Sequence, residues 1–264
     1  MPRWDPDVYE RYKAYRDRPA LDLMLQIPRD FAPREIWDLG CGTGEHAMIL
    51  ARRHPEARVH ALDSSDAMLA RGRTKDTGID WVLGDIAAFA PDAAPDLIFT
   101  NAALQWLPDH RALFTRLVRS LAPDGVLACQ IPVVFDEGWR RSLGQVAREG
   151  PWADRLAALD GVQPGHDARA YHDWLSPLCA DLDIWTTTYL HALEGEDPIV
   201  DWTLGTSLRP YLERLSDDAE RDAFLAAWRV ALARDYPRRE DGVTLFPFSR
   251  MFLIARTWGV DALT

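Results

Sequence analysis

The sequence has few cysteines and no long apolar run, and each of these absences excludes a class of protein. Only Cys41, Cys129 and Cys179 occur in 264 residues, far apart and without the spacing of a metal site. An odd number of cysteines in a chain whose amino-terminal segment is too charged for a secretory leader indicates reduced thiols. No apolar stretch approaches the roughly 20 residues that span a bilayer. We therefore expect a cytoplasmic protein without a metal site or a membrane partner.

Positive charge is also scarce. The chain has 30 lysines and arginines against 41 aspartates and glutamates, which gives a formal net charge of −11. A field of that sign repels nucleic acid and anionic lipid, so we expect no nucleic-acid partner. An anionic small molecule would have to be received by arginines gathered in one place. The sequence leaves the oligomeric state open.

Short apolar runs alternate with amphipathic segments in the first half of the chain. The runs are "EIWDL", "ARVHALD", "IDWVLGD", "APDLIFTNA" and "VLACQIPV". Strands that alternate with helices in this rhythm indicate βαβ units. Two later runs, "DIWTTTYLHAL" and "FSRMFLIARTW", are also rich in strand-forming residues. We predict an α/β fold, with a Rossmann-like, doubly wound, mostly parallel sheet of seven strands.

The rhythm changes after Phe135, where helix-like pieces and breaks such as "VQPGH" replace it. Residues 136–180 and 197–240 are expected to be helical insertions, the latter with two helices, the second starting at Ser216. We predict a single domain over residues 1–264. In it these insertions form a cap over the carboxyl ends of the strands, and residues 1–27 form a helical lid.

Three glycines lie between the first strand and the helix that follows it. In "IWDLGCGTGEHAMILA" they are Gly40, Gly42 and Gly44. Glycine permits a positive φ and lets a ligand approach the backbone closely. The following helix amino terminus offers free N–H groups to a carboxylate or phosphate. The spacing differs from the G-x-G-x-x-G of dinucleotide sites, which disfavours a nicotinamide oxidoreductase.

A polar residue lies at or near the carboxyl end of each of the first four predicted strands. Asp38 lies in the first, Asp63 closes the second, Asp85 follows the third and Asn101 ends the fourth. Ligands bind at the carboxyl ends of strands in open α/β sheets, so these side chains predict a cofactor site. The alternative is that the glycines only make a turn and the acids only cap helices.

This set resembles the class I S-adenosylmethionine-dependent methyltransferases. The matching residues are the D-x-G-x-G-x-G loop from Asp38 to Gly44, the acid Asp63, and "GDI" at residues 84–86. The resemblance implies that Asp63 holds the ribose hydroxyls, that Asp85 and Ile86 contact the adenine, and that the loop holds the methionine portion. S-adenosyl-L-homocysteine would be the cofactor product. The implied cofactor residues are Asp38, Gly40, Gly42, Gly44, Asp63, Ser64, Asp85, Ile86 and Asn101.

Longer motifs resemble one family within that class, the trans-aconitate 2-methyltransferases. They are "WDPDVYERYKAYRDRPALDLMLQIP", "NAALQWLPDH", "YHDWLS", "DIWTTTYLHAL", "DWTLGTSLRPYL" and "FSRMFLIAR", and together they extend over the whole chain. Thr43 stands where that family usually has proline. The resemblance implies methylation of one carboxylate of trans-aconitate to a monomethyl ester. The alternatives are another small carboxylic acid, a natural-product hydroxyl, or a non-catalytic module that binds the cofactor.

Carboxylate methylation sets modest demands on the protein. The acceptor is already ionised near pH 7, so we expect no general base and no catalytic residue in the strict sense. Arginines should hold the other carboxylates. Gln105 and Trp106 follow the fourth strand, near the expected methyl-transfer point. The substrate-binding candidates are Tyr9, Arg18, Gln105, Trp106, Arg209, Tyr211 and Arg250.

Three of the residues in these motifs have a structural alternative. Arg18 is equally well explained by a surface ion pair. Trp106 is equally well explained as a core anchor. His110 is expected to cap or pack the helix "DHRALF" rather than to act in catalysis.

Overall fold

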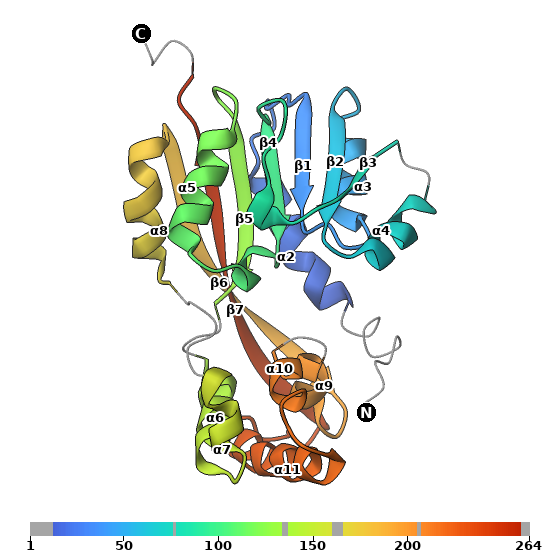
Figure 1. The fold of residues 1–264 in the computed structure, drawn as a ribbon, viewed down its shortest axis with the longest axis vertical. Helices are drawn as coiled ribbons and strands as arrows, with labels where there is room; N and C mark the ends of the chain where they lie inside the picture. Colours follow the sequence, from blue (N-terminus) through green and yellow to red (C-terminus); the bar gives the residue numbers. More distant parts are fainter. Residues whose placement is uncertain (1–12, 76–77, 134–136, 160–165, 205–206, 260–264) are drawn as a thin grey trace. The chain divides into compact units, whose positions relative to one another are not determined.

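The computed structural model describes residues 13–75, 78–133, 137–159, 166–204 and 207–259 (Figure 1). The chain divides into two compact units. The first, which we call the sheet unit, comprises Arg18–Pro132, His166–Thr187 and Arg250–Thr264. The second, the helical unit, comprises Met1–Asp17, Val133–Gly165 and Thr188–Ser249. The sequence predicts a single domain; the structure differs because two buried cores form, and the division falls inside two long strands.

Seven strands make one sheet in the order β3-β2-β1-β4-β5-β7-β6. β1 to β5 are parallel to one another, and β7 runs antiparallel to its neighbour β5 (Figure 1). This confirms the predicted Rossmann-like, mostly parallel sheet of seven strands. The strand order reverses between β1 and β4, where ligands bind in such sheets. The strands are β1 (Glu35–Leu39), β2 (Arg58–Asp63), β3 (Asp80–Leu83), β4 (Leu97–Asn101), β5 (Val126–Pro132), β6 (Asp181–Glu194) and β7 (Val243–Arg256).

Several helices of the sheet unit begin at a residue whose side chain caps the first turn. Ser65 Oγ accepts a hydrogen bond from Met68 N at the start of α4, and Asp109 Oδ1 accepts one from Ala112 N at the start of α5. Asp109 adopts a positive φ of 48°, which turns the chain sharply out of the preceding short helix. The helices are α3 (Glu45–Arg53), α4 (Asp66–Arg73), α5 (His110–Ser120), α8 (Ala168–Leu175), η1 (Ile86–Ala88), η2 (Leu104–Trp106) and η4 (Ser176–Leu178), with α2 (Lys13–Gln26) continuing across the unit boundary.

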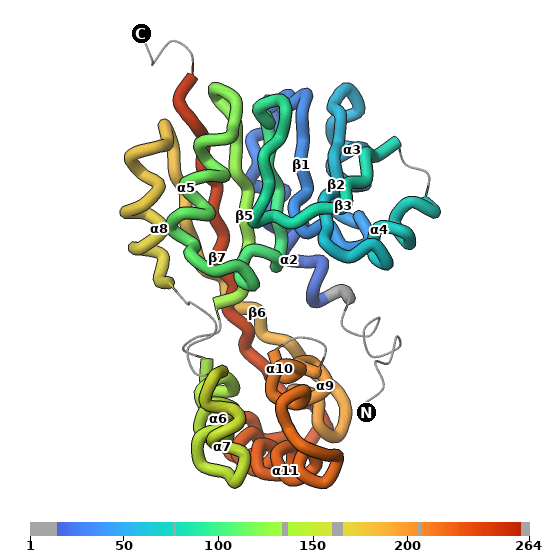
Figure 2. Tube along the Cα trace, in the orientation of Figure 1, coloured from blue at the N-terminus to red at the C-terminus, as the bar shows by residue number. Residues whose placement is uncertain are grey.

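The sequence predicts that residues 136–180 belong to a cap insertion, but helix α8, within that range, belongs to the sheet unit. It lies beside α5 in the sheet unit, where Figure 2 shows the two helices next to each other. Tyr171 is fully buried, and its ring packs edge-on against Phe114 with centroids 4.9 Å apart. Because α8 packs on α5, the described part of that insertion that belongs to the helical unit is residues 137–159.

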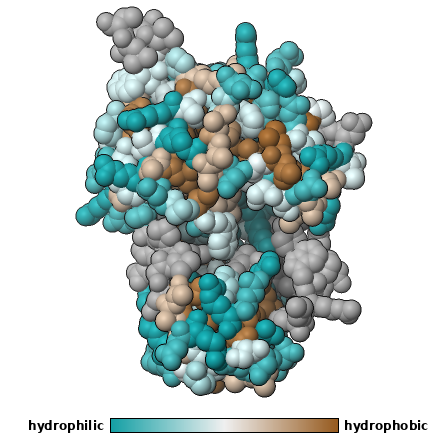
Figure 3. All heavy atoms as spheres, viewed as in Figure 1, coloured by the Kyte–Doolittle hydropathy of each residue, from teal (hydrophilic) through white to brown (hydrophobic). Residues whose placement is uncertain are grey.

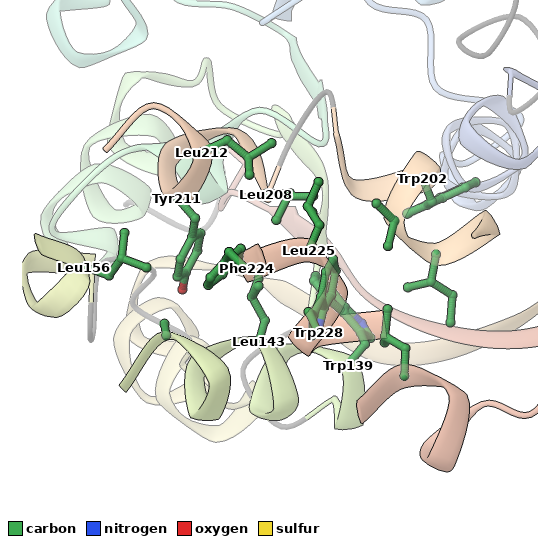
Figure 4. Packing of buried hydrophobic residues seen from close by; sticks show 14 of the residues in the cluster. Trp139, Leu143, Leu156, Trp202, Leu208, Tyr211, Leu212, Phe224, Leu225 and Trp228 are labelled. Carbon is green, nitrogen blue, oxygen red and sulfur yellow. The ribbon is translucent and has the colours of Figure 1, made fainter. Parts of the chain in front are cut away.

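The helical unit has an aromatic core. Side chains of Trp139 and Leu143 from α6 meet Phe224 and Trp228 from α11 (Figure 4). Trp139 and Trp228 are both fully buried, as expected for tryptophans that pack rather than bind. The sequence predicts two helices over residues 197–240; the described part of that range has three, because Arg209–Leu212 forms an extra short helix with Pro210 in its first turn. The helices are α6 (Gly138–Glu149), α7 (Ala153–Leu156), η3 (Ala157–Leu159), α9 (Pro198–Leu204), α10 (Arg209–Leu212) and α11 (Asp218–Asp235).

The surface is mixed in character. The face seen in Figure 3 carries hydrophobic patches between hydrophilic side chains on the sheet unit. Among the described residues, no helix has both the length and the apolar content needed to cross a membrane.

Candidate functional site

The glycine loop has the backbone that the sequence predicts. Gly40, Gly42 and Gly44 have φ values of 76°, 58° and 79°. A Cβ on Gly40 would lie 2.3 Å from the Cβ of Ala103, and one on Gly44 would lie 2.1 Å from the Trp81 ring. A Cβ on Gly42 would meet nothing within 4 Å. Two of the glycines are therefore required by the protein's own packing, and the third leaves the backbone open to close approach by a ligand.

Asp38 lies beneath this loop and is 1% exposed. Burial raises the pKa of Asp38 to about 7, with Asp63 and Glu45 adding to the effect and a backbone hydrogen bond at Ala47 opposing it. Its Oδ2 has no hydrogen-bond partner among the described residues. A buried carboxylate oxygen without a partner is unfavourable unless a donor or cation reaches it. An ammonium group fits that requirement.

Asp63 links the loop to the start of α4. Its Oδ2 accepts from Gly42 N and its Oδ1 accepts from Ser65 N, both at 2.8 Å. Each carboxylate oxygen can accept more than one hydrogen bond, so the two oxygens of Asp63 can still accept hydrogen bonds from a pair of hydroxyl groups. Ser64, beside it, is exposed. The arrangement fits a ribose diol.

The turn after β3 is fixed from two directions. Asp85 Oδ1 accepts from Ala87 N at 2.8 Å and so caps η1, while the Ile86 side chain is buried. Arg116 from α5 donates to Phe89 O at 2.6 Å and to Ile86 O at 3.0 Å. Nothing in the sequence points to Arg116, because a residue 30 positions away from Ile86 gives no local signal of this contact.

Thr43, the departure from the resembling family, is built into a local network. Its hydroxyl donates to Glu45, and Lys75 Nζ donates to Thr43 O at 2.9 Å and to Glu45 Oε1 at 3.0 Å. Although burial raises the pKa of Glu45, the hydrogen bonds from Thr43 and Lys75 lower it to about 2. Glu45 is thus ionised near neutral pH and stiffens the loop.

The turn after β4 is strained and polar. Ala102 has a positive φ of 54°, and its carbonyl accepts from Gln105 Nε2 at 2.7 Å. Asn101 Oδ1 and Gln105 Oε1 are buried without a hydrogen-bond partner among the described residues. The Trp106 side chain is 52% exposed, so the alternative that it is a core anchor is wrong.

The three predicted arginines lie in different environments. Arg250 is 4% exposed, and its Nη1 donates to Gln130 Oε1 at 3.1 Å. Arg18 faces Asp22 at 3.7 Å and Arg209 binds Glu213 at 2.7 Å, each with its side chain 71% exposed. A buried guanidinium is costly and therefore informative, whereas exposed i,i+4 pairs are common.

The remaining predicted side chains are placed as follows. Tyr211 is buried in the helical unit, and Tyr9 lies outside the described residues. His110 is 1% exposed, and its Nδ1 is hydrogen-bonded to the Tyr171 hydroxyl. Burial and nearby His166 lower the pKa of His110. His110 therefore joins α5 to α8 as a packed, neutral side chain, in line with the expectation.

Comparison with known proteins agrees with this geometry. Residues 36–125 match a family described as a methyltransferase domain. The solved structure of the YcgJ protein from Bacillus subtilis has a TM-score of 0.58 at 15% identity, covering 91% of this chain and 99% of that one. Phosphoethanolamine N-methyltransferase 2 from Haemonchus contortus has a TM-score of 0.54 at 15% identity, covering 92% of this chain and 52% of that one. At such identities the likeness shows the fold alone.

The fold, the glycine loop and the matched domain define an S-adenosylmethionine-dependent methyltransferase. A trans-aconitate 2-methyltransferase from Azoarcus sp. is 44% identical over 97% of this chain and 99% of its own length. The chain belongs to the trans-aconitate 2-methyltransferase family.

Proposed function

We propose that the protein transfers a methyl group from S-adenosylmethionine to one carboxylate of trans-aconitate and forms its monomethyl ester. The observation that carries this is the 44% identity to the Azoarcus enzyme over 97% of the chain. That similarity includes the helical unit, not only the common methyltransferase fold. A family member that had changed its class of substrate would be expected to diverge in the segments outside the common fold.

The cofactor is assigned to the carboxyl edge of β1, β2 and β3. Asp38 faces the ammonium of the methionine portion, and the open side of Gly42 admits the chain of the cofactor. Asp63 receives the ribose hydroxyls, with Ser64 beside it. Asp85 and Ile86 contact the adenine from the turn that Arg116 fixes.

When bound, S-adenosylmethionine supplies a methyl group on a cationic sulfur, and a carboxylate oxygen takes that methyl while the sulfur keeps the electron pair of the broken bond. No proton moves, because the acceptor is ionised near neutral pH. The residues of this chain therefore orient the reactants and exclude water from the attacking oxygen. Asn101 at the end of β4, and Gln105 and Trp106 just after it, lie where such orientation is needed.

Methyl transfer to a panel of di- and tricarboxylates, followed by mass spectrometry, tests the proposal. We expect a product about 14 mass units heavier than trans-aconitate, because one acidic proton is replaced by a methyl group. This product should form much faster than the corresponding esters of cis-aconitate or citrate. Ester formation on another small acid only would contradict trans-aconitate as the substrate. Cofactor binding without any ester would overturn carboxylate methylation itself.

A further inference from the structure

Gln130 on β5 is a buried amide with one fixed and one unused end. It is fully buried, and its Oε1 accepts from Arg250 Nη1 at 3.1 Å. The amide oxygen must face the guanidinium, because the reversed amide would set a donor against a donor. Nε2 therefore points elsewhere, and it has no hydrogen-bond partner within the described part of the chain.

The strand register places this amide on the same face as the cofactor residues. Asp38 pairs with Phe99, and Asn101 pairs with Gln130. Side chains two apart in a strand share a face, so Asp38, Asn101 and Gln130 project to one side of the sheet. Arg250 lies two residues from Phe252, which is the register partner of Gln130 on β7, so it projects to that side as well.

The order of the strands separates the two ends of this row. Neighbouring strands are about 4.8 Å apart, so Gln130 stands about 10 Å from β1 and Arg250 about 14 Å from it. The glycine loop follows β1, on the other side of β4 (Figure 1). The amide and the guanidinium thus lie on the acceptor side of the point where the methyl group is transferred.

The Gln130 amide and the Arg250 guanidinium are both hydrogen-bond donors, and the guanidinium also carries a buried positive charge. A buried N–H group that lacks a partner is costly, and a carboxylate oxygen is the acceptor that would satisfy an amide next to an arginine. A purely structural Gln–Arg pair gives no reason for the amide N–H groups to stay unbonded.

We propose that Gln130, oriented by Arg250, binds a carboxylate of the methyl acceptor that is not itself methylated. This inference rests on the proposed function and names the residue that selects the acceptor. The amide donates two N–H groups in a direction set by the guanidinium. A carboxylate held there fixes the distance at which a second carboxylate of the same acid can reach the methyl group.

Gln130→Glu tests the proposal with little change of shape. The new carboxylate accepts from Arg250, as the amide oxygen does, but it repels an acidic acceptor instead of donating to it. We expect trans-aconitate to bind the S-adenosylhomocysteine complex about 100-fold more weakly, since a donor is lost and a like charge is added. The affinity for S-adenosylhomocysteine should stay within about twofold, since the cofactor contacts are on the other strands. Titration calorimetry measures both.

Two further variants keep the test decisive. Gln130→Met removes the donors without adding charge and should weaken trans-aconitate binding about tenfold; it carries the test if Gln130→Glu does not fold. Cys129→Ala, at the next buried position of β5 and on the opposite face, is the matched control and should bind both ligands like the wild type.

The outcomes are distinguishable. Weaker acceptor binding with unchanged cofactor binding in the Gln130 variants supports the inference. Equal acceptor affinity in the wild type and both variants overturns it and leaves the proposed function standing. An equal loss for both ligands also overturns it, because Gln130 would then serve the cofactor or the fold. A wild type that binds and methylates no carboxylate overturns the proposed function, and the inference with it.

Discussion

The two units differ in how their buried polar atoms are hydrogen-bonded. In the helical unit the indole N–H groups of Trp228 and Trp152 donate to Ser142 Oγ at 3.1 Å and to Val146 O at 2.8 Å. In the sheet unit Asp38, Asn101 and Gln130 each leave a buried polar atom without a hydrogen-bond partner among the described residues. These three lie side by side on one face of neighbouring strands.

Unbonded polar atoms also occur in the helical unit, at Trp139 Nε1 and Arg140 Nη1. They are consecutive residues at the start of one helix, not a row across several strands. A row built by three strands at the carboxyl edge of the sheet is what a ligand with several polar groups would meet. The helical unit has a packed aromatic core. The sheet unit has buried polar atoms without hydrogen-bond partners among the described residues, on the strands where the ligands are expected to bind.

The largest effect is expected in the aromatic core. Trp228→Ala removes a fully buried indole and leaves Ser142 Oγ without its donor, so it should lower the free energy of unfolding by about 3–5 kcal/mol. Urea denaturation followed by circular dichroism measures this. Val230→Ala, on the same helix but 74% exposed, should change it by less than about 0.5 kcal/mol. Similar losses in both variants would contradict the core role of Trp228.

Asp63→Ala should act on the ligand instead. It removes the acceptor proposed for the ribose hydroxyls and the anchor of Gly42 N, and should weaken S-adenosylhomocysteine binding by about 1–3 kcal/mol. Titration calorimetry measures the change. Asp66→Ala, at the exposed start of α4, is the matched control and should bind like the wild type. Unchanged affinity in Asp63→Ala would remove the ribose role.

Asp38→Asn should stabilise the ligand-free protein in a pH-dependent way. The pKa of Asp38 is raised by burial from 3.8 to about 7 in the folded state. Ionised Asp38 therefore destabilises the fold, with no cost below the unfolded pKa, a growing cost as pH rises, and a constant cost above about 7. Between about pH 5.5 and pH 8 the advantage of Asn over Asp should grow by about 2 kcal/mol, at 1.36 kcal/mol per unit.

The same substitution should weaken cofactor binding, because the ammonium would lose its carboxylate. Urea denaturation of the ligand-free protein at the two pH values measures the effect on stability separately from the effect on cofactor binding. The exposed substitution Asp92→Asn is the control. A stability advantage that is equal at both pH values would show that Asp38 does not titrate in this range.

The sequence predicts the sheet unit better than the helical unit, for a physical reason. Short apolar strands, three glycines and acids at strand ends are local patterns, and each has one dominant structural meaning. Gln130 carried no such signal, since an amide inside the apolar run "VLACQIPV" acquires its meaning only when β7 brings Arg250 beside it. The division of residues 136–180 between the units likewise depends on Tyr171 reaching α5, a contact between distant segments.

The smallest effect is expected at an arginine that the sequence motifs favour. Arg209 is 71% exposed and pairs with Glu213 one helical turn away, an arrangement worth no more than about 0.5 kcal/mol. Arg209→Lys keeps this pair and should leave both stability and the KM for trans-aconitate within about twofold of the wild type. Initial rates against trans-aconitate at saturating cofactor measure the KM.

Because lysine cannot bind a carboxylate in the bidentate manner of arginine, a large rise in KM with unchanged kcat would show that Arg209 holds the substrate. In that case the helical unit would contribute a substrate-binding residue as well as a packed core. The difference between the two units would then concern only the hydrogen bonding of their buried polar atoms.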